Sequence, residues 1–232
     1  MQQKNSEVIR GLIFDLDGTL ANTEMQHYRA WRKTLMANGV VELSMETFLT
    51  YVGTSNEKVA GDHVETFGLE KTVEELVREK QAIYMEAISE IELFSGVREF
   101  LQQFYKKLPI ALATSSHCRE AVAILKAKGI LDFFDKVIGG DMVEKRKPDP
   151  EIYLQSCDML GLPPASCVAF EDSTHGVESA HQAGMYVVAI PNSFTKEHYF
   201  SGADIVVQSI AEIDVHLQPL LEMEQTKTVT SL

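Results

Sequence analysis

Residues 8–19 read VIRGLIFDLDGT, and this stretch decides the fold. Its apolar run, interrupted only by Arg10 and Gly11, predicts a buried β-strand over residues 8–14. Two aspartates, Asp15 and Asp17, come directly after that run. We therefore expect a pair of carboxylates at the carboxyl end of the first strand.

The segment that follows this strand is helical in pattern. Residues 23–38 carry side chains at helical spacing and end at an Asn-Gly pair; the spaced residues are Met25, Tyr28, Trp31 and Leu35. Residues 44–90 continue the helical pattern without a convincing strand. Their plausible helix starts are Ser44 with Thr47, Thr54 with Glu57, and Thr72 with Glu75.

The rest of the chain alternates helices and strands. Helices are predicted over 97–107, 117–128, 150–160 and 175–183, and strands over 110–113, 136–138, 167–170, 186–190 and 205–207. Such alternation predicts an α/β fold: a doubly wound, Rossmann-like parallel sheet as the core, with an inserted α-helical domain. We place the core at residues 1–21 and 93–220, the helical insertion at 22–92 and a flexible tail at 221–232.

Composition narrows the classes of protein that the chain can be. The 232 residues carry a net charge of −13 with no dense basic patch, so we expect no nucleic-acid partner. No apolar run has the length of a membrane span or a signal peptide, which predicts a cytoplasmic protein with no membrane partner. The three cysteines lack a CxxC spacing and are expected to be reduced thiols.

The polar residues that end the predicted strands point to one site. In an open parallel sheet, the site lies beyond the carboxyl ends of the strands. The residues at those ends are Asp15, Thr114, Asp141 and the pair Glu171-Asp172. They are far apart in the sequence, and the predicted fold brings them together.

The carboxylates of this predicted site require a cation. Two like charges about 4 Å apart repel by about 4 kcal/mol at an effective dielectric near 20. Asp15, Asp17, Glu171 and Asp172 would share one pocket, and oxygen ligands favour a hard ion such as Mg²⁺. We expect Asp15 and Asp172 to be side-chain ligands, with a backbone carbonyl near Asp17 and Glu171 in the same cluster.

Each residue of the predicted site can be given a chemical role. Asp15 is ionised at neutral pH and can attack phosphorus without a base, and Asp17 can act as acid and then as base. Thr114 and Lys147 would meet the charge of phosphoryl oxygens. Taken singly, each motif has a structural alternative: a turn at DxDGT, a helix cap at Thr114 or Glu171-Asp172, and a solvated loop at Lys147-Pro148.

The residues in this order resemble the haloacid dehalogenase superfamily of phosphotransferases, over about Gly11 to Ile213. Asp15-Leu16-Asp17-Gly18-Thr19, Thr114, Lys147 and Glu171-Asp172 are similar to its four motifs. The resemblance implies a phospho-aspartate on Asp15 and an acid/base at Asp17. It also implies Mg²⁺ held by Asp15, the Asp17 carbonyl and Asp172, and a phosphate held by Thr114, the Ser115 backbone and Lys147.

Within that superfamily, the chain is similar to the β-phosphoglucomutase subgroup, whose helical insertion is a cap. The mutase holds a second phosphate with a cap arginine, and here Asn56 stands at that place, while Lys80 matches a cap lysine. An amide cannot make the charged bidentate contact of arginine. We therefore expect a phosphatase acting on a small phosphorylated metabolite with one phosphate, with an intramolecular mutase as the alternative.

The substrate itself is not named by these motifs. Candidate cap and core residues to line the pocket are His27, Trp31, Tyr51, Asn56, Lys80, Ser116 and His117, with Ser115 beside the phosphate. Trp31 and Tyr51 are also candidates for simple packing within the cap. We expect a monomer, because core and cap together can close the site. Dehalogenation would need only the first aspartate, and Asp17 with the metal-type carboxylates argues against it.

Overall fold

The structure is a computed structural model that describes residues 8–213. The tail predicted at 221–232 lies outside the described residues. A six-stranded sheet has the order β5-β4-β1-β6-β7-β8, and every neighbouring pair is parallel. Its strands are β1 (Gly11–Phe14), β4 (Ile110–Thr114), β5 (Lys136–Gly139), β6 (Cys167–Glu171), β7 (Tyr186–Ala189) and β8 (Ile205–Val206). The predicted doubly wound sheet is confirmed.

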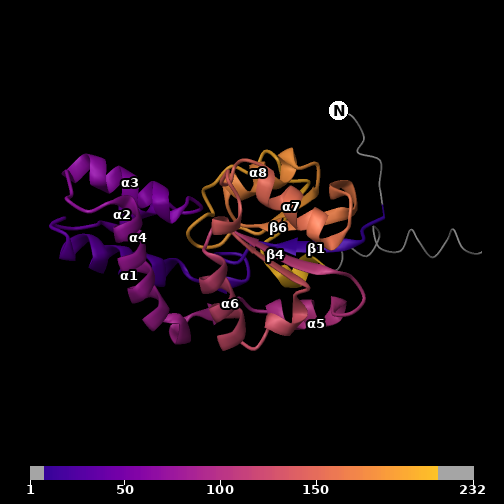
Figure 1. Ribbon diagram of the computed structural model, residues 1–232. Helices are drawn as coiled ribbons and strands as arrows, with labels where there is room; N and C mark the ends of the chain where they lie inside the picture. Colours follow the sequence, from indigo (N-terminus) through magenta and orange to yellow (C-terminus); the bar gives the residue numbers. More distant parts are fainter. Residues whose placement is uncertain (1–7, 214–232) are drawn as a thin grey trace, which may run out of the picture.

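Helices cover both faces of this sheet (Figure 1). α5 (Val97–Phe104) and α6 (Cys118–Ala127) lie on one face, and α7 (Glu151–Leu160) and α8 (Thr174–Gln182) on the other. Because successive side chains of a strand point to opposite faces, β1 contributes side chains to the apolar cores on both faces of the sheet. Leu12 and Phe14 pack with α5 and α6, whereas Ile13 packs with α7 and α8.

The strand ends differ slightly from the prediction. β1 begins at Gly11 instead of Val8, while β4 and β6 each extend one residue further, to Thr114 and Glu171. Phe14 stacks on Phe170 of the neighbouring strand, with ring centroids 4.4 Å apart. Thr114 pairs with Gly139 and Glu171 with Ala189, so both are held by strand pairing and are not loop residues.

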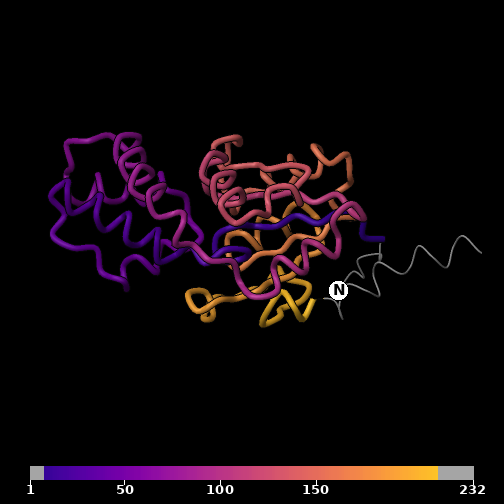
Figure 2. Tube along the Cα trace, turned by 90° about the horizontal axis from the view of Figure 1, so that it is seen from below, coloured from indigo at the N-terminus to yellow at the C-terminus, as the bar shows by residue number. Residues whose placement is uncertain are grey.

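The predicted helical segment forms a separate block beside the sheet (Figures 1 and 2). It contains α1 (Glu24–Ala37), α2 (Met45–Leu49), α3 (Asn56–Phe67), α4 (Val73–Glu86) and the short η1 (Ile88–Glu90). Ser44 and Thr72 cap α2 and α4 as expected. α3 is capped by Ser55, whose hydroxyl accepts from the Lys58 N–H, and not by Thr54. Trp31, Leu35 and their neighbours form the block's own apolar core.

A short antiparallel ribbon joins this block to the sheet domain. β2 (Ala21–Asn22) pairs with β3 (Glu92–Leu93), so the two chain crossings run side by side. The sequence analysis missed both strands, because two-residue strands carry no periodicity. The predicted boundaries at 22 and 92 fall on this ribbon. Four short 3₁₀ turns complete the described elements: η2 (Leu131–Phe133), η3 (Gly140–Met142), η4 (Pro164–Ser166) and η5 (Ile210–Glu212).

Two further expectations can be compared with the described residues. Cys118, Cys157 and Cys167 are all free thiols, as predicted. Across residues 8–213, no helix combines the length and the apolar character that crossing a membrane requires.

Candidate active site

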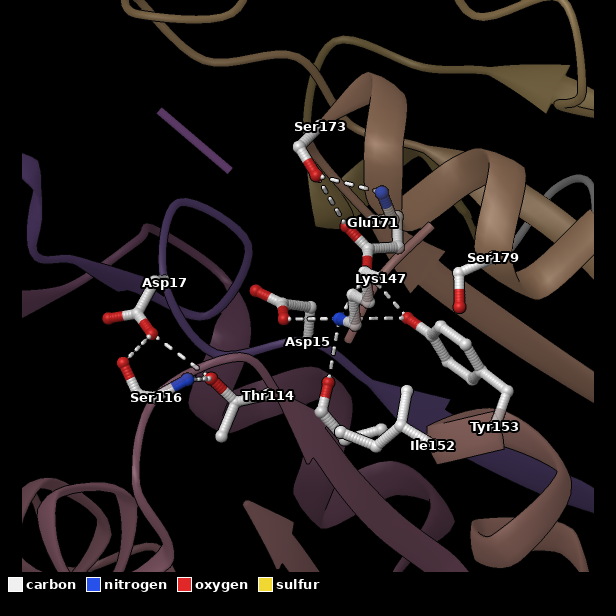
Figure 3. Close-up of polar contacts among 12 residues, drawn as sticks. Asp15, Asp17, Thr114, Ser116, Lys147, Ile152, Tyr153, Glu171, Ser173 and Ser179 are labelled. Carbon is white, nitrogen blue, oxygen red and sulfur yellow. Dashed lines mark hydrogen bonds and ion pairs between the residues drawn. The ribbon is translucent and has the colours of Figure 1, made fainter. Parts of the chain in front are cut away.

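The predicted site residues converge at the carboxyl edge of the sheet (Figure 3). Asp15 follows β1, Thr114 ends β4, Glu171 ends β6, and Asp172 follows it. β1 lies between β4 and β6 in the sheet, which brings these ends to one place. Asp141, which was expected there too, is exposed, and its Oδ1 accepts a hydrogen bond from the Cys118 N–H at 2.7 Å instead.

Lys147 makes hydrogen bonds to several groups at this edge of the sheet. Its Nζ donates to Asp15 Oδ1 at 2.7 Å, Glu171 Oε1 at 2.6 Å and the Ala113 carbonyl at 2.9 Å. The side chains of Lys147, Asp15 and Glu171 are 3%, 8% and 1% exposed. Burial alone would lower the pKa of Lys147, but the charges of Asp15 and Glu171 outweigh it and raise that pKa. Lys147 is therefore a permanent cation inside the site.

Three buried carboxylates gather around this single lysine. Oxygens of Asp15, Glu171 and Asp172 lie within 4.8 Å of one another. Burial raises the pKa values of Asp15 and Asp172 well above their usual range, with Lys147 lowering them only in part. The cluster thus lacks positive charge, and its all-oxygen donor set fits a divalent ion such as Mg²⁺.

The three carboxylates are not equally available to an ion. Glu171 Oε1 also accepts from the Tyr153 hydroxyl at 2.6 Å, and its Oε2 accepts from Ser173 Oγ at 3.3 Å. Gly176 leaves room for this carboxylate, because a Cβ there would lie 1.9 Å from the Glu171 carboxyl carbon. Glu171 is committed to protein partners, which leaves Asp15 and Asp172 as the direct ligands that the site offers.

Asp172 is held by residues that the sequence analysis missed. Asn192 Nδ2 donates to Asp172 Oδ2 at 2.7 Å and to the Gly18 carbonyl at 3.0 Å. The buried Thr195 hydroxyl adds a longer contact to the same oxygen at 3.4 Å. Asn192 links the loop after β1 to the end of β6. The sequence could have predicted Asn192 as a site residue, because it comes just after the strand predicted at 186–190.

Asp17 faces away from the carboxylate cluster (Figure 3). Its Oδ2 accepts from Ser116 Oγ at 2.7 Å and from Thr114 Oγ1 at 3.1 Å, and Oδ1 lies 3.2 Å from His27 Nε2. Burial would raise the pKa of Asp17, but hydrogen bonds from His27, Thr23 and Ser116 hold it well below its usual range. Asp17 is ionised in this conformation.

A cavity of about 80 Å³ lies between these strand ends and the helical block. Of the predicted site residues, Asp15, Asp17, His27, Asn56, Ser115, Ser116, Lys147 and Asp172 line it. Trp31 and Tyr51 also line it while packing with the core of the helical block, so both interpretations of these rings hold. Glu24, which the sequence analysis did not select, lines it too; burial and Asp17 raise its pKa to about 8.

Four predicted site residues do not line the cavity. Thr114 and Glu171 are fully buried and contact Asp17 and Lys147. Lys80 is fully buried, and its Nζ donates to His27 Nδ1 at 2.7 Å and lies 4.4 Å from the Tyr84 ring centroid. His117 Nε2 lies 3.2 Å from Glu57 Oε1, and Arg146 Nη2 donates to the same oxygen at 3.1 Å.

Lys80 acts on Asp17 through His27. The ammonium donates to Nδ1, so His27 carries its proton on Nε2 and donates it to Asp17. Burial, with Lys80 next, lowers the pKa of His27, which keeps the ring neutral. The helical block thus contributes a fixed donor to Asp17.

The chain is similar in sequence to known proteins. A family model described as haloacid dehalogenase-like hydrolase matches residues 12–190. Protein CbbY of Rhodobacter capsulatus is 36% identical over 84% of this chain and 91% of its own. Fructose-1-phosphate phosphatase YqaB of Escherichia coli is 31% identical over 78% and 95%.

Solved structures have the same fold. A CbbY variant from Rhodobacter sphaeroides in complex with xylulose-(1,5)bisphosphate has a TM-score of 0.81 and 28% identity, covering 88% of this chain and 96% of its own. β-Phosphoglucomutase from Clostridium difficile has a TM-score of 0.80 and 25% identity, covering 94% and 99%.

Proposed function

The chain belongs to the haloacid dehalogenase-like hydrolase family, and we propose that it is a magnesium-dependent phosphatase that hydrolyses a small phosphate monoester, a sugar phosphate, through a phospho-aspartate. One observation carries the proposal. Asp15 lines the cavity with Lys147 Nζ 2.7 Å from its Oδ1, Asp172 close behind it and Asp17 two residues away. A nucleophile, a cation, a metal-type carboxylate pair and an acid/base thus share one small space.

Asp15 is the proposed nucleophile. Lys147 holds Oδ1, so the other oxygen, Oδ2, is the one that can turn toward a phosphorus atom. Mg²⁺ held by Asp15, Asp172 and the Asp17 carbonyl would supply the positive charge that the buried carboxylates lack, and would neutralise phosphoryl oxygens. Glu171 keeps Lys147 in place between them.

Asp17 is the proposed acid and base. Thr114 and Ser116 now donate to its carboxylate, and phosphate oxygens would compete for those two hydroxyls. With those donors turned toward phosphate, the pKa of Asp17 rises, because hydrogen bonds to the ionised form are lost. Asp17 can then protonate the leaving oxygen and later accept a proton from the attacking water.

The phosphate-binding side is provided by the core. Ser115, Ser116 and Lys147 line the cavity beside Asp15, and Thr114 supports Ser116 by accepting a hydrogen bond from its N–H at 3.0 Å. His27 and Asn56 face the same cavity from the helical block, which we propose to be a cap over residues 22–92. Lys80 acts in this scheme by orienting His27.

We favour hydrolysis over the mutase alternative because of the residue that the helical block places in the cavity wall. A mutase must hold a second phosphate, and the cavity wall offers the neutral Asn56 there. The relatives include both kinds of protein, a fructose-1-phosphate phosphatase and a β-phosphoglucomutase. We further propose a cytoplasmic monomer whose partner is a small phosphorylated metabolite, with no nucleic-acid or membrane partner.

The experiment is hydrolysis of p-nitrophenyl phosphate with Mg²⁺. Asp15→Asn should abolish turnover, and chelation of Mg²⁺ should do the same to the unchanged protein. Asp158→Asn is the matched control, because Asp158 is an exposed aspartate on α7 outside the cavity lining. Retained turnover in Asp15→Asn would refute the nucleophile. Conversion of β-glucose 1-phosphate to glucose 6-phosphate, with little free phosphate released, would favour the mutase.

A further inference from the structure

We propose that Glu57 determines substrate specificity: its carboxylate occupies the donor site formed by His117 and Arg146 beside the cavity lining, and so excludes a second anionic group of the substrate. The substrate class is then a monophosphate ester whose remaining part is uncharged. This inference rests on the proposed function only in taking the substrate to be a phosphate ester.

The three residues come from three separate elements. Glu57 lies in the first turn of α3 in the helical block, His117 precedes α6, and Arg146 lies in the loop before α7. Glu57 Oε1 lies 3.2 Å from His117 Nε2 and 3.1 Å from Arg146 Nη2. We call this group the rim triad. It connects α3 to two core loops.

The members of the rim triad do not line the cavity themselves. Each is the sequence neighbour of a residue that does: Asn56, Ser116 and Lys147. A group extending from a phosphate at Asp15 past these three lining residues would approach Glu57, His117 and Arg146.

No other cation among the described residues is available to that group. Lys147 is committed to Asp15 and Glu171, and Lys80 is fully buried against His27. Apart from Glu24 and His27, the cavity lining that the helical block supplies consists of apolar and neutral polar residues, among them Trp31, Tyr51 and Asn56. Neutralisation of a second phosphate would need His117 and Arg146, and Glu57 already occupies both.

The triad has donor capacity that a carboxylate does not use. Both donors share Oε1, while Glu57 Oε2 and Arg146 Nη1 are buried without a hydrogen-bond partner. A phosphate, with three terminal oxygens, could engage both nitrogens of the guanidinium. The hydrogen bond from His117 lowers the pKa of Glu57 to about 2, and the same bond raises the pKa of His117.

The fold itself admits a bisphosphate, since a CbbY structure with 28% identity contains one. Exclusion must therefore come from side chains, and Glu57 is the anion placed to cause it. An incoming second phosphate would have to displace this carboxylate from its two donors, and would meet like charge while doing so.

The test is competitive inhibition of p-nitrophenyl phosphate hydrolysis by fructose 1-phosphate and by fructose 1,6-bisphosphate. In Glu57→Gln the inhibition constant of the bisphosphate should fall about tenfold or more, the value of one charged hydrogen bond gained. That of the monophosphate should change less than about threefold. Asp62→Asn is the matched control: it removes one negative charge from the same helix, where Asp62 pairs with Lys58.

A second variant identifies the cation. Glu57→Gln combined with Arg146→Gln should lose the gain for the bisphosphate. Arg146→Gln alone should leave the ratio of the two inhibition constants within about threefold of the unchanged protein, because Glu57 already occupies that guanidinium. If Glu57→Gln fails to fold, a tenfold loss of bisphosphate inhibition in Arg146→Gln alone would still overturn the inference.

Two outcomes overturn the inference. One is an unchanged bisphosphate constant in a folded Glu57→Gln, and the other is a tenfold loss of bisphosphate inhibition in Arg146→Gln alone. Absence of aryl phosphatase activity in the unchanged protein would instead refute the proposed function, so the two failures are distinguishable.

Discussion

Removal of the charge of Lys147 should destabilise the protein and lower its turnover. Lys147→Met keeps an unbranched side chain and leaves Asp15 and Glu171 buried without their shared cation. Breaking a buried ion pair by removing one partner costs about 3–5 kcal/mol, because the remaining charge stays desolvated. For a chain of this size, 1 kcal/mol shifts Tm by about 2–4 °C, so Tm should fall by about 6–20 °C.

The assay is thermal unfolding in the absence of Mg²⁺, with Lys145→Met as the matched control. Lys145 lies two residues away, its side chain is 71% exposed, and it pairs with Asp149 at 3.7 Å. An exposed pair of this kind contributes about 0–1 kcal/mol, so the control should unfold close to the unchanged protein. Turnover in Lys147→Met should fall by about 10²–10³-fold, because a fixed charge facing the phosphoryl group is lost.

A further variant separates charge from packing. Glu171→Met added to Lys147→Met removes one of the two stranded carboxylates, so the double variant should be more stable than Lys147→Met alone. The reasoning is refuted if Lys147→Met unfolds at the temperature of Lys145→Met, because the buried carboxylates would then need no cation from the protein.

Two other residues give predictions with distinct readouts. Asn192→Ala should raise the Mg²⁺ concentration for half-maximal activity about 10–100-fold and weaken Mg²⁺ binding by calorimetry, because Asp172 loses the amide that orients it; a purely structural role would lower Tm without changing Mg²⁺ binding. Ser116→Ala removes a donor to ionised Asp17, so the pKa of Asp17 rises. Because Asp17 must be protonated to give its proton to the leaving oxygen, the alkaline limb of kcat/KM moves to higher pH; an unmoved limb contradicts this.

The alternation of strands and helices could be predicted from the sequence because it depends on local patterns of residues. The apolar run before Asp15 and the runs before Thr114 and Glu171 mark buried strands, and parallel strands of a doubly wound sheet end on one edge. That rule alone places Asp15, Thr114 and Glu171-Asp172 together. The rule failed for Asp141, which also follows a strand but lies outside the cavity lining.

The contact partners of long side chains could not be predicted from the sequence in the same way. Lys80 and His117 were expected to contact substrate. In the structure, Lys80 contacts His27 and His117 contacts Glu57. A lysine or arginine can reach several neighbours, and which one it meets depends on how α4, α3 and the core loops pack. Asn192 was missed for the same reason, because its amide contacts Gly18, which is 174 positions away, and Asp172, which is 20 positions away.

The sequence by itself determined the class of chemistry, because carboxylates, a lysine and hydroxyls at strand ends require only that the strands be parallel and neighbouring. Residues 11–19 supply two of these carboxylates, Asp15 and Asp17, and the other residues come from segments far along the chain. Tertiary structure alone decided how the charges are shared: Lys147 between Asp15 and Glu171, Asp17 turned toward Thr114 and Ser116, and Glu57 across the rim. The physical reason is that Coulomb energies and desolvation depend on distance and burial, which arise only when the helical block and the sheet pack together.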